Sequence, residues 1–332
     1  MSKVTILIPI YNVEEYVEKC LKSLIKQTFH DFEIWAVDDG SPDNSKKIVE
    51  KYSKVDSRIK LIEKKNGGYG SVLQLGVNNV KSDYLLICDP DDWLADNALE
   101  KLYSFASDNN LDIAVGDKYN VFVDDGSVEY QKSFSDDLHI VPNKVYVDQQ
   151  HIQRFSFAEV SPHAKLFRTE NLKKIKFPKK VSYTDFVLYI MALANAKRVG
   201  YLNIPLAYYL RDRPGNTATD TSLKSVHYNC VVWKSVEKQL SQLDTENEYS
   251  VLWFRMYIQL KSIINEYGKA SEHPFADEYS NEVKLLILLA QKYKNSMKHY
   301  AKKSLKSSLF FNGLMNKYFY KEFALLYIKL AS

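Results

Sequence analysis

Three aspartates follow one short apolar run and pose the first chemical question of this sequence. In the stretch "YLLICDPDDWL", Asp89, Asp91 and Asp92 come directly after five apolar or aromatic residues. One interpretation is helix capping, since acids favour the positive end of a following helix and Asp96 is placed to begin one. Capping does not account for Asp89. The second interpretation is a pair of carboxylates that binds Mg²⁺ or Mn²⁺ while phosphates fill the other coordination positions, which predicts a nucleotide diphosphate ligand.

A calcium loop of the EF-hand type is a further alternative for the same acids. Asp89, Asp91 and Glu100 would occupy positions 1, 3 and 12 of that loop. The loop needs glycine at position 6, where this chain has Leu94, and its position 5 is Trp93. The EF-hand is therefore excluded.

Two common phosphate-binding motifs are excluded as well. The stretch "NGGYGSVLQLG" contains Gly68 and Gly70, but Leu73 stands where GxGxxG needs its third glycine. The stretch also does not follow the first predicted strand, and the chain has no GxxxxGK[ST]. The sequence therefore supports neither the usual dinucleotide fold nor a P-loop.

The elements that must position the acids alternate between strand and helix over the first 115 residues or so. Apolar runs predict strands at residues 4–11, 32–40, 58–65 and 83–89, with amphipathic helices between them. This alternation predicts an α/β fold with a mostly parallel sheet and helices on both faces. Ligands of such sheets bind at the carboxyl ends of the strands. The polar residues at those ends are Tyr11, Asn12, Asp38, Asp39, Asn66, Asp89, Asp91 and Asp92.

The rest of the chain predicts a change of architecture. Up to about residue 220 the pattern is mixed, with a hairpin around an Asp125-Gly126 turn and a strand over residues 199–211. From about Ser222 onward the periodicity is helical. We therefore expect an α/β domain followed by a helical extension at residues 221–332.

Composition indicates a globular protein of a reducing compartment. The chain has 332 residues, of which 45% are hydrophobic and 26% charged. Its three cysteines have no CxxC spacing, so neither a disulfide framework nor a structural zinc site is expected. The N-terminus predicts a strand and no signal peptide, and the longest aliphatic run, residues 285–290, is far below the ~20 residues of a membrane span. We expect a cytoplasmic protein, with peripheral attachment to the inner membrane face as an open alternative.

Several stretches are similar to the motifs of one enzyme family. They are the opening "VTILIPIYNVEEYVEKCLKSLIKQTFHDFEIWAVDDGSPDNS", then "DPDDWL", "HAKLFR", "FPKKVSYTDF" and "YYLRDRPGNT". On these motifs, which extend over about residues 3–217, the chain resembles the inverting family 2 glycosyltransferases of the GT-A fold. That bacterial group makes surface polysaccharides. The resemblance implies a catalytic domain at residues 1–220, with a nucleotide-binding half at 1–115 and an acceptor-side half at 116–220.

The resemblance also assigns roles to single residues. Asp39 would bind the uracil edge, Tyr11 would lie near the base, and Asp91 would hold the metal ion on the diphosphate of a UDP-sugar. Asp89 would hold the ribose or the metal, and Asp92 would shape the sugar pocket. The full set of expected donor-binding residues is Pro9, Tyr11, Asn12, Asp39, Asn66, Gly67, Asp89, Asp92, Arg211 and Arg213.

Inverting transfer also needs a base that takes the proton of the acceptor hydroxyl. The resemblance assigns this role to Asp185 in "SYTDF", although Thr184 replaces the glutamate of the family motif. An N-cap for the following helix is the structural alternative. Arg211 and Arg213 would close over the diphosphate, because the planar fork of arginine pairs with phosphate oxygens; a surface salt bridge is their alternative.

One segment departs from the family pattern. Many relatives carry "SAARNxG" after the double glycine, whereas this chain has "GSVLQLG", with Leu73 and Gln74 at the Arg-Asn positions. The donor phosphates are therefore left to other groups, and Arg211 and Arg213 are the candidates.

The C-terminal region is strongly basic. Residues 284–332 contain ten lysines and one acid, a net charge of +9, so the rest of the chain carries −5. Lys294, Lys298, Lys302 and Lys306 recur every four residues, as on one face of a helix. Lysines interspersed with aromatic residues up to about residue 330 are compatible with an anionic membrane surface. A solvated helix face docked on the core and a homo-oligomer contact are the alternatives.

The sequence thus predicts a metal-dependent transferase. We expect it to move a hexose or N-acetylhexosamine from a UDP-sugar to a glycan acceptor, expected to be lipid-linked, with Mn²⁺ or Mg²⁺. A non-catalytic nucleotide-sugar-binding partner of another transferase is the alternative. A sugar nucleotidyltransferase would need a glycine-rich loop with basic residues after the first strand, and "IPIYNVEEY" has none. Nucleic acid is not expected, because no binding motif accompanies the positive charge.

Overall fold

The computed structural model describes residues 2–213, 220–244, 246, 248–301 and 304–331. Contacts along the chain divide it into two compact units. The first comprises residues 1–180 and 184–216, and the second residues 181–183 and 217–332.

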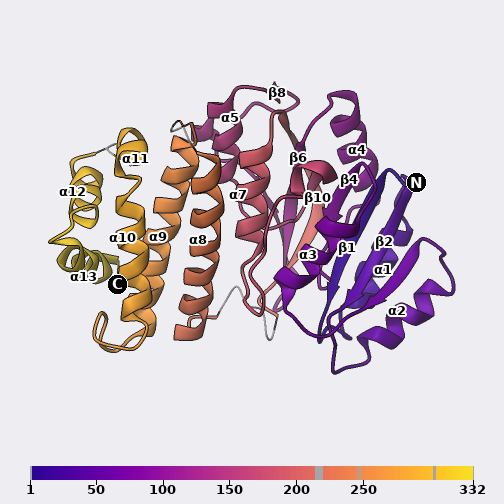
Figure 1. Ribbon diagram of the computed structural model, residues 1–332. Helices are drawn as coiled ribbons and strands as arrows, with labels where there is room; N and C mark the ends of the chain where they lie inside the picture. The colour runs from indigo at the N-terminus through magenta and orange to yellow at the C-terminus, as the bar shows by residue number, and fades with distance from the viewer. Residues whose placement is uncertain (1, 214–219, 245, 247, 302–303, 332) are drawn as a thin grey trace. The chain divides into compact units, whose positions relative to one another are not determined.

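The first half of unit one forms parallel strands. They are β1 (Val4–Ile10), β2 (Phe32–Asp38), β3 (Ile59–Glu63) and β4 (Tyr84–Ile87). In Figure 1 the indigo strands β1 and β2 lie side by side, and every neighbouring pair in the order β3-β2-β1-β4 is parallel. All seven residues of β1 are buried, because it is a central strand and its sequence is apolar on both faces.

The second half of unit one adds antiparallel pairs to the same sheet. Its strands are β5 (Trp93–Leu94), β6 (Ile113–Phe122), β7 (Val128–Gln131), β8 (Val145–Tyr146), β9 (Lys165–Arg168) and β10 (Val199–Arg211). Strand β9 runs antiparallel to both β4 and β6, whereas β10 runs parallel to β6. The hairpin predicted at Asp125-Gly126 joins β6 to β7. The antiparallel ladders are short, so the expected mostly parallel α/β sheet is confirmed.

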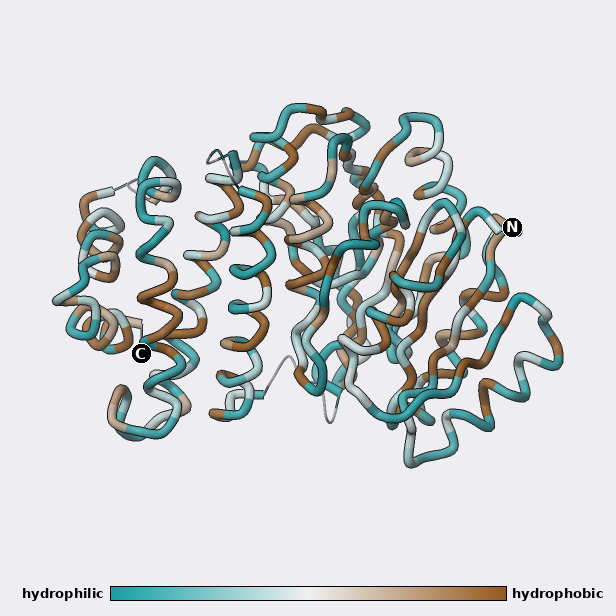
Figure 2. Tube along the Cα trace, in the orientation of Figure 1, coloured by the Kyte–Doolittle hydropathy of each residue, from teal (hydrophilic) through white to brown (hydrophobic). Residues whose placement is uncertain are grey.

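Helices flank this sheet, as the alternation predicts. The helices of unit one are α1 (Val17–Ile25), α2 (Ser45–Ser53), α3 (Tyr69–Asn79), α4 (Ala98–Asp108), α5 (Gln149–Arg154), α6 (Thr169–Leu172) and α7 (Asp185–Asn195). Short 3₁₀ turns lie at Asp136–Leu138 and Phe155–Phe157. Figure 2 shows the strands of the sheet mostly in brown, the colour of apolar residues.

Unit two is helical. Its helices are α8 (Leu223–Leu243), α9 (Ser250–Ala270), α10 (Ser280–Gln291), α11 (Lys294–Ala301), α12 (Leu305–Leu314) and α13 (Tyr320–Ala331). Trp233 and Trp253 are its largest buried side chains, and Trp253 stacks on Tyr293 with ring centroids 3.5 Å apart. None of the helices that the structure describes is long and apolar enough to cross a bilayer.

The lysines that recur every four residues do not lie on a single helix. Lys294 and Lys298 belong to α11, which ends at Ala301, and Lys306 belongs to α12. Ser304 begins α12 with a capping box shared with Ser307, which is the physical reason for the break. Lys302 lies outside the described residues. The expectation of one continuous lysine face is therefore wrong.

Candidate functional site

The three aspartates lie in a turn directly after β4. The backbone N–H of Asp92 donates to the carbonyl of Asp89 over 3.0 Å and closes the turn. Oδ1 of Asp89 accepts a 2.7 Å hydrogen bond from the hydroxyl of Tyr69, at the start of α3. Burial raises the pKa of Asp89 to about 7; the charge of His163 opposes the shift, and those of Asp92 and Asp91 add to it.

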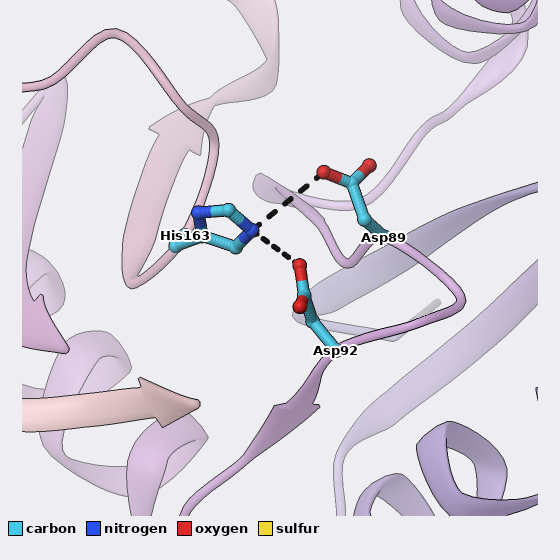
Figure 3. A group of neighbouring side chains, drawn as sticks. All are labelled: Asp89, Asp92 and His163. Carbon is cyan, nitrogen blue, oxygen red and sulfur yellow. Dashed lines mark hydrogen bonds and ion pairs between the residues drawn. The ribbon is translucent and has the colours of Figure 1, made fainter. Parts of the chain in front are cut away.

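Asp92 is buried and bound on both sides. Its Oδ2 contacts Nε2 of His163, as Figure 3 shows, and its Oδ1 accepts the backbone N–H of Leu210 over 2.8 Å. Burial raises the pKa of Asp92 well above its usual value and lowers the pKa of His163 to about 4. Both groups are thus driven towards their neutral forms and pair through a hydrogen bond. The contacts join the acidic turn to strand β10.

Asp91 points to a different partner. Its Oδ2 lies 2.5 Å from Nε of Arg213, so a cation already contacts this carboxylate. Arg213 also lies over the ring of Tyr16, 5.1 Å from the centroid. The structure therefore brings Arg213 to the acidic turn, and its contact is with the predicted metal ligand.

The donor set of the turn fits a hard divalent ion. Asp89, Asp92 and His163 offer ligand atoms within 4.8 Å of one another. Asp92 and His163, however, are buried and hydrogen-bonded to each other, so an ion bound by both would have to separate them. Asp89 and Asp91 offer carboxylate oxygens, the ligands that Mg²⁺ and Mn²⁺ prefer. The Asp91 carboxylate already binds one cation, the guanidinium of Arg213.

Asp39 holds the loop that follows β3. Its Oδ1 accepts from Nζ of Lys64 and, over 3.0 Å, from the N–H of Gly67, and its Oδ2 accepts from the N–H of Gly68 over 2.7 Å. A carboxylate has about four lone-pair positions, so these three donors leave one for a ligand. The exposed Asn66 lies in the same loop.

Tyr11 and Asn12 lie at the end of β1, beside the end of β2. The N–H of Asp39 donates to the carbonyl of Ile10 over 2.9 Å, so the two strand ends are adjacent. Tyr11 is 51% exposed, Pro9 is buried within β1, and Asn12 has a positive φ of 54°. An exposed ring thus stands beside the loop that Asp39 orders.

Asp185 is the first residue of α7. Thr184 occupies the N-cap, without a side-chain capping bond, so Asp185 is not the capping residue. Burial raises the pKa of Asp185 to about 6, while the backbone N–H of Phe186 opposes the shift. A Cβ on Gly70 would lie 3.0 Å from the side chain of Thr184, and the neighbouring Tyr69 binds Asp89. Asp185 therefore follows a residue that packs against the start of α3, close to the acidic turn.

The match to a family decides the identity of this fold. The model of Glycosyl transferase family 2 matches residues 5–176, just over half of the chain. The chain belongs to glycosyl transferase family 2. The resemblance found in the sequence is thereby confirmed.

Curated relatives of this family 2 chain include glycosyltransferase GlyA of Streptococcus pneumoniae, 33% identical over 233 residues, which is 68% of this chain and 33% of GlyA. Glycosyltransferase GlyG of the same species is 27% identical over 63% of this chain and 70% of GlyG. Poly(ribitol-phosphate) beta-glucosyltransferase of Bacillus spizizenii is 30% identical over 64% of this chain and 33% of the relative. The matches thus span only about a third of GlyA and of the Bacillus relative.

Solved structures show the same fold. Residues 1–349 of Staphylococcus aureus TarS, in complex with UDP-GlcNAc, superpose with a TM-score of 0.67 at 20% identity over 98% of this chain and 90% of the TarS chain. The mannosyltransferase PcManGT of Pyrobaculum calidifontis, in complex with GDP-Man and Mn²⁺, gives 0.52 at 14% identity over 98% and 87%. The GT-A fold is thereby confirmed.

The departure from the family 2 pattern has a structural role. Leu73 is buried in α3, and Gln74 binds the segment that leads to α7: its Oε1 accepts the N–H of Phe177 over 3.1 Å, and its Nε2 donates to the carbonyl of Ile175 over 3.2 Å. Gln74 thus positions the chain before Asp185.

Two glycines allow the same close packing. Gly68 has a φ of +79°, and a Cβ on it would lie 3.0 Å from the backbone of Lys180. A Cβ on Gly70 would lie 2.3 Å from the carbonyl oxygen of Pro178. Gly68 and Gly70 therefore allow the segment before α7 to approach the start of α3 closely.

Three buried polar residues next to this site, His163, Lys165 and Lys118, were given no role from the sequence. His163 belongs to the quoted "HAKLFR" motif, and Lys165 lies two residues on. Nζ of Lys165 donates to the carbonyl of Glu159 over 2.8 Å, and Lys118 pairs with the Glu159 carboxylate over 2.5 Å. Burial lowers the pKa of Lys165 to about 7. The signal was a histidine and a lysine inside an apolar motif, but Asp92, the partner of His163, lies 71 positions away in the chain.

Proposed function

We propose that this chain transfers a hexose or N-acetylhexosamine, with inversion, from a UDP-sugar to a glycan acceptor. Membership of glycosyl transferase family 2 supports the reaction class. The observation that carries the proposal is the acidic turn after β4, which follows the carboxyl end of a parallel strand, as Tyr11 and Asp39 do. The complex of TarS with UDP-GlcNAc supports the donor class.

The nucleotide is proposed to bind at the ends of β1 and β2. The lone-pair position left on Asp39 would accept the uracil N3–H, and the exposed ring of Tyr11 would stack on the base. Asn12, Asn66 and Gly67 would line the nucleotide at the same edge.

Asp91 and Asp89 would hold Mn²⁺ or Mg²⁺ at the diphosphate. When bound, the ion supplies a Lewis acid that stabilises the charge of the departing UDP. Arg211, at the end of β10, and Arg213 would pair with phosphate oxygens. Asp92, locked by His163 and Leu210, would give the sugar pocket a fixed wall.

Asp185 is proposed as the base. As the acceptor hydroxyl oxygen forms its bond to the anomeric carbon, the bond from that carbon to UDP breaks, and the hydroxyl proton passes to the Asp185 carboxylate. A pKa of about 6 leaves most of Asp185 deprotonated at neutral pH and still basic enough to accept a proton.

The acceptor is proposed to be a lipid-linked glycan, bound by the half of the domain at residues 116–220. Unit two supports contact with an anionic membrane at the cytoplasmic face. Its α12 and α13 region exposes large apolar side chains, namely Leu305, Leu309, Tyr318, Phe319, Leu325, Leu326 and Leu330. Exposed lysines, among them Lys306, Lys317 and Lys321, lie between them, and apolar residues with lysines fit an anionic lipid surface.

The experiment is UDP release measured over a panel of UDP-sugars with Mn²⁺, with and without a glycan acceptor. Turnover of one donor supports the proposal and names the sugar. Binding of UDP without turnover of any donor, even with acceptors supplied, would favour the alternative of a non-catalytic nucleotide-sugar-binding partner. A donor that turns over only with a polyol-phosphate acceptor would replace the lipid-linked glycan.

A further inference from the structure

Arg213 binds the carboxylate of Asp91, which is the proposed ligand of the metal ion. Its Nε lies 2.5 Å from Oδ2 of Asp91, and the two side chains are only 17% and 10% exposed. The Tyr16 ring, which lies 5.1 Å from the guanidinium, adds a cation–π contact. The arginine is therefore held by a charge and by a ring, in a place shielded from water.

The ion pair between Arg213 and Asp91 places a positive charge in a turn that carries three aspartates. Asp91 stands between Asp89 and Asp92 in the chain, and all three carboxylates belong to one tight turn. Asp92 is hydrogen-bonded to His163, whereas Asp91 has the guanidinium as its charged partner. Removing a charged partner from a buried acid leaves its charge uncompensated, so the turn favours whichever cation replaces Arg213.

We propose that Arg213 is the internal counter-ion of Asp91, and that a divalent ion reaches Asp91 only by displacing it. This inference rests on the proposed function, in which Asp91 is a metal ligand. A ligand binds with an affinity reduced by the fraction of molecules in which its site is free. Metal alone therefore binds weakly, because Arg213 competes for the same oxygen.

The nucleotide changes this balance. The diphosphate of UDP offers the displaced guanidinium a new partner, because arginine pairs with phosphate oxygens through its planar fork. Metal and UDP therefore bind cooperatively, each raising the affinity of the other by the same factor. Arg213 couples the two ligands by changing partner between Asp91 and the diphosphate.

Mn²⁺ binding tests this coupling without any turnover. The electron paramagnetic resonance signal of free Mn²⁺ gives the dissociation constant of the full chain with and without UDP. The variants are Arg213→Ala, Arg213→Lys, Asp91→Asn and Arg211→Ala. Arg211→Ala is the matched control, because it also removes one positive charge near the end of β10. The side chain of Arg211 lies over the ring of Tyr209, 5.2 Å from the centroid.

We expect Arg213→Ala to bind Mn²⁺ more tightly than wild type without UDP, on the order of fivefold or more, and to lose the part of the UDP gain that comes from displacing Arg213, while the diphosphate itself still strengthens Mn²⁺ binding. Arg213→Lys should fall between them, and Arg211→Ala should match wild type without UDP. Unchanged or weaker Mn²⁺ binding by Arg213→Ala would overturn the inference, as would equal tightening in Arg211→Ala. If Asp91→Asn binds Mn²⁺ like wild type with UDP, the metal assignment itself is wrong.

Discussion

His163 and Asp92, 71 positions apart in the chain, form a buried hydrogen bond between Nε2 and Oδ2. Asp92 also accepts the N–H of Leu210, so one carboxylate joins the acidic turn, the loop before β9 and strand β10. The ring of His163 stacks on Tyr209 with centroids 4.5 Å apart. The hydrogen bond therefore fixes the acidic turn relative to the strand that ends at Arg211.

Replacing His163 by alanine should destabilise the protein by about 1–3 kcal/mol, because Asp92 loses a partner while it stays buried. His163→Gln, whose amide N–H can donate to the carboxylate, should recover part of this loss. Urea unfolding at pH 7.5 measures both variants. His30→Ala, at an exposed position, is the control. Equal stability of His163→Ala and wild type would show that the hydrogen bond contributes nothing.

The proposed base predicts a pH dependence of transfer. Asp185 must be deprotonated to accept a proton, so the transfer rate should fall as the pH decreases through about 6. Asp185→Asn should lose transfer by about 100-fold or more and still bind UDP. A rate that stays flat from pH 7.5 to 5 would contradict the assignment.

The same group predicts a stability effect of opposite sign. Because folding raises the pKa of Asp185 from 3.8 to about 6, the folded state binds more protons than the unfolded state between these values. Its contribution to stability therefore decreases as the pH rises through this window. At pH 7.5 Asp185→Asn should be at least as stable as wild type by thermal unfolding. A clear loss of stability would indicate that Asp185 has a structural role instead.

Gly70 should not tolerate alanine. In a helix, glycine to alanine normally stabilises by about 1 kcal/mol, but here the added Cβ would lie 2.3 Å from a backbone oxygen of Pro178. We expect a loss of about 1–3 kcal/mol in the free energy of unfolding. Gly126→Ala is the control: its Cβ meets nothing within 4 Å, so only its positive φ of +70° acts, at about 1–2 kcal/mol. A stabilised Gly70→Ala variant would refute the close packing of α3 on the segment before α7.

The proposed membrane contact predicts that the protein sediments with vesicles that contain anionic lipid. Leu326→Glu combined with Leu330→Glu should reduce the bound fraction, because charge replaces exposed apolar area on α13. Val55→Glu, at a position 81% exposed in unit one, is the matched control. Binding that is equal for all three proteins, or absent for wild type, would rule out this surface; concentration-dependent association in its place would favour an oligomer.

Much of the fold could be predicted from the sequence, because its signals are local. The apolar runs at β1, β2 and β4 and the polar residues after them are set by neighbouring positions, and they place Tyr11, Asp39 and Asp89 at one edge. Strand β9 has four residues and no alternation, so its antiparallel insertion between β4 and β6 depends on long-range pairing. The prediction of one continuous lysine face was wrong, because the capping box at Ser304 begins a new helix within the four-residue repeat.

The partners within the site could not be predicted, for the same reason. Arg213 lies 122 positions from Asp91, and Phe177 lies 103 positions from Gln74. The residues around Gln74 do not show whether its side chain binds phosphate or holds the segment before α7. Only the folded chain shows the second role.

The most direct measurement is the turnover of UDP-sugar with Mn²⁺ and with a chelator, for wild type, Asp91→Asn and Asp96→Asn. Asp96 is exposed at the end of the same stretch and has no assigned role at the site. We expect wild type and Asp96→Asn to release UDP only with metal, and Asp91→Asn to be reduced by about 100-fold or more. Equal turnover by Asp91→Asn, or turnover that persists in the chelator, would contradict a transferase whose metal is held by the acidic turn.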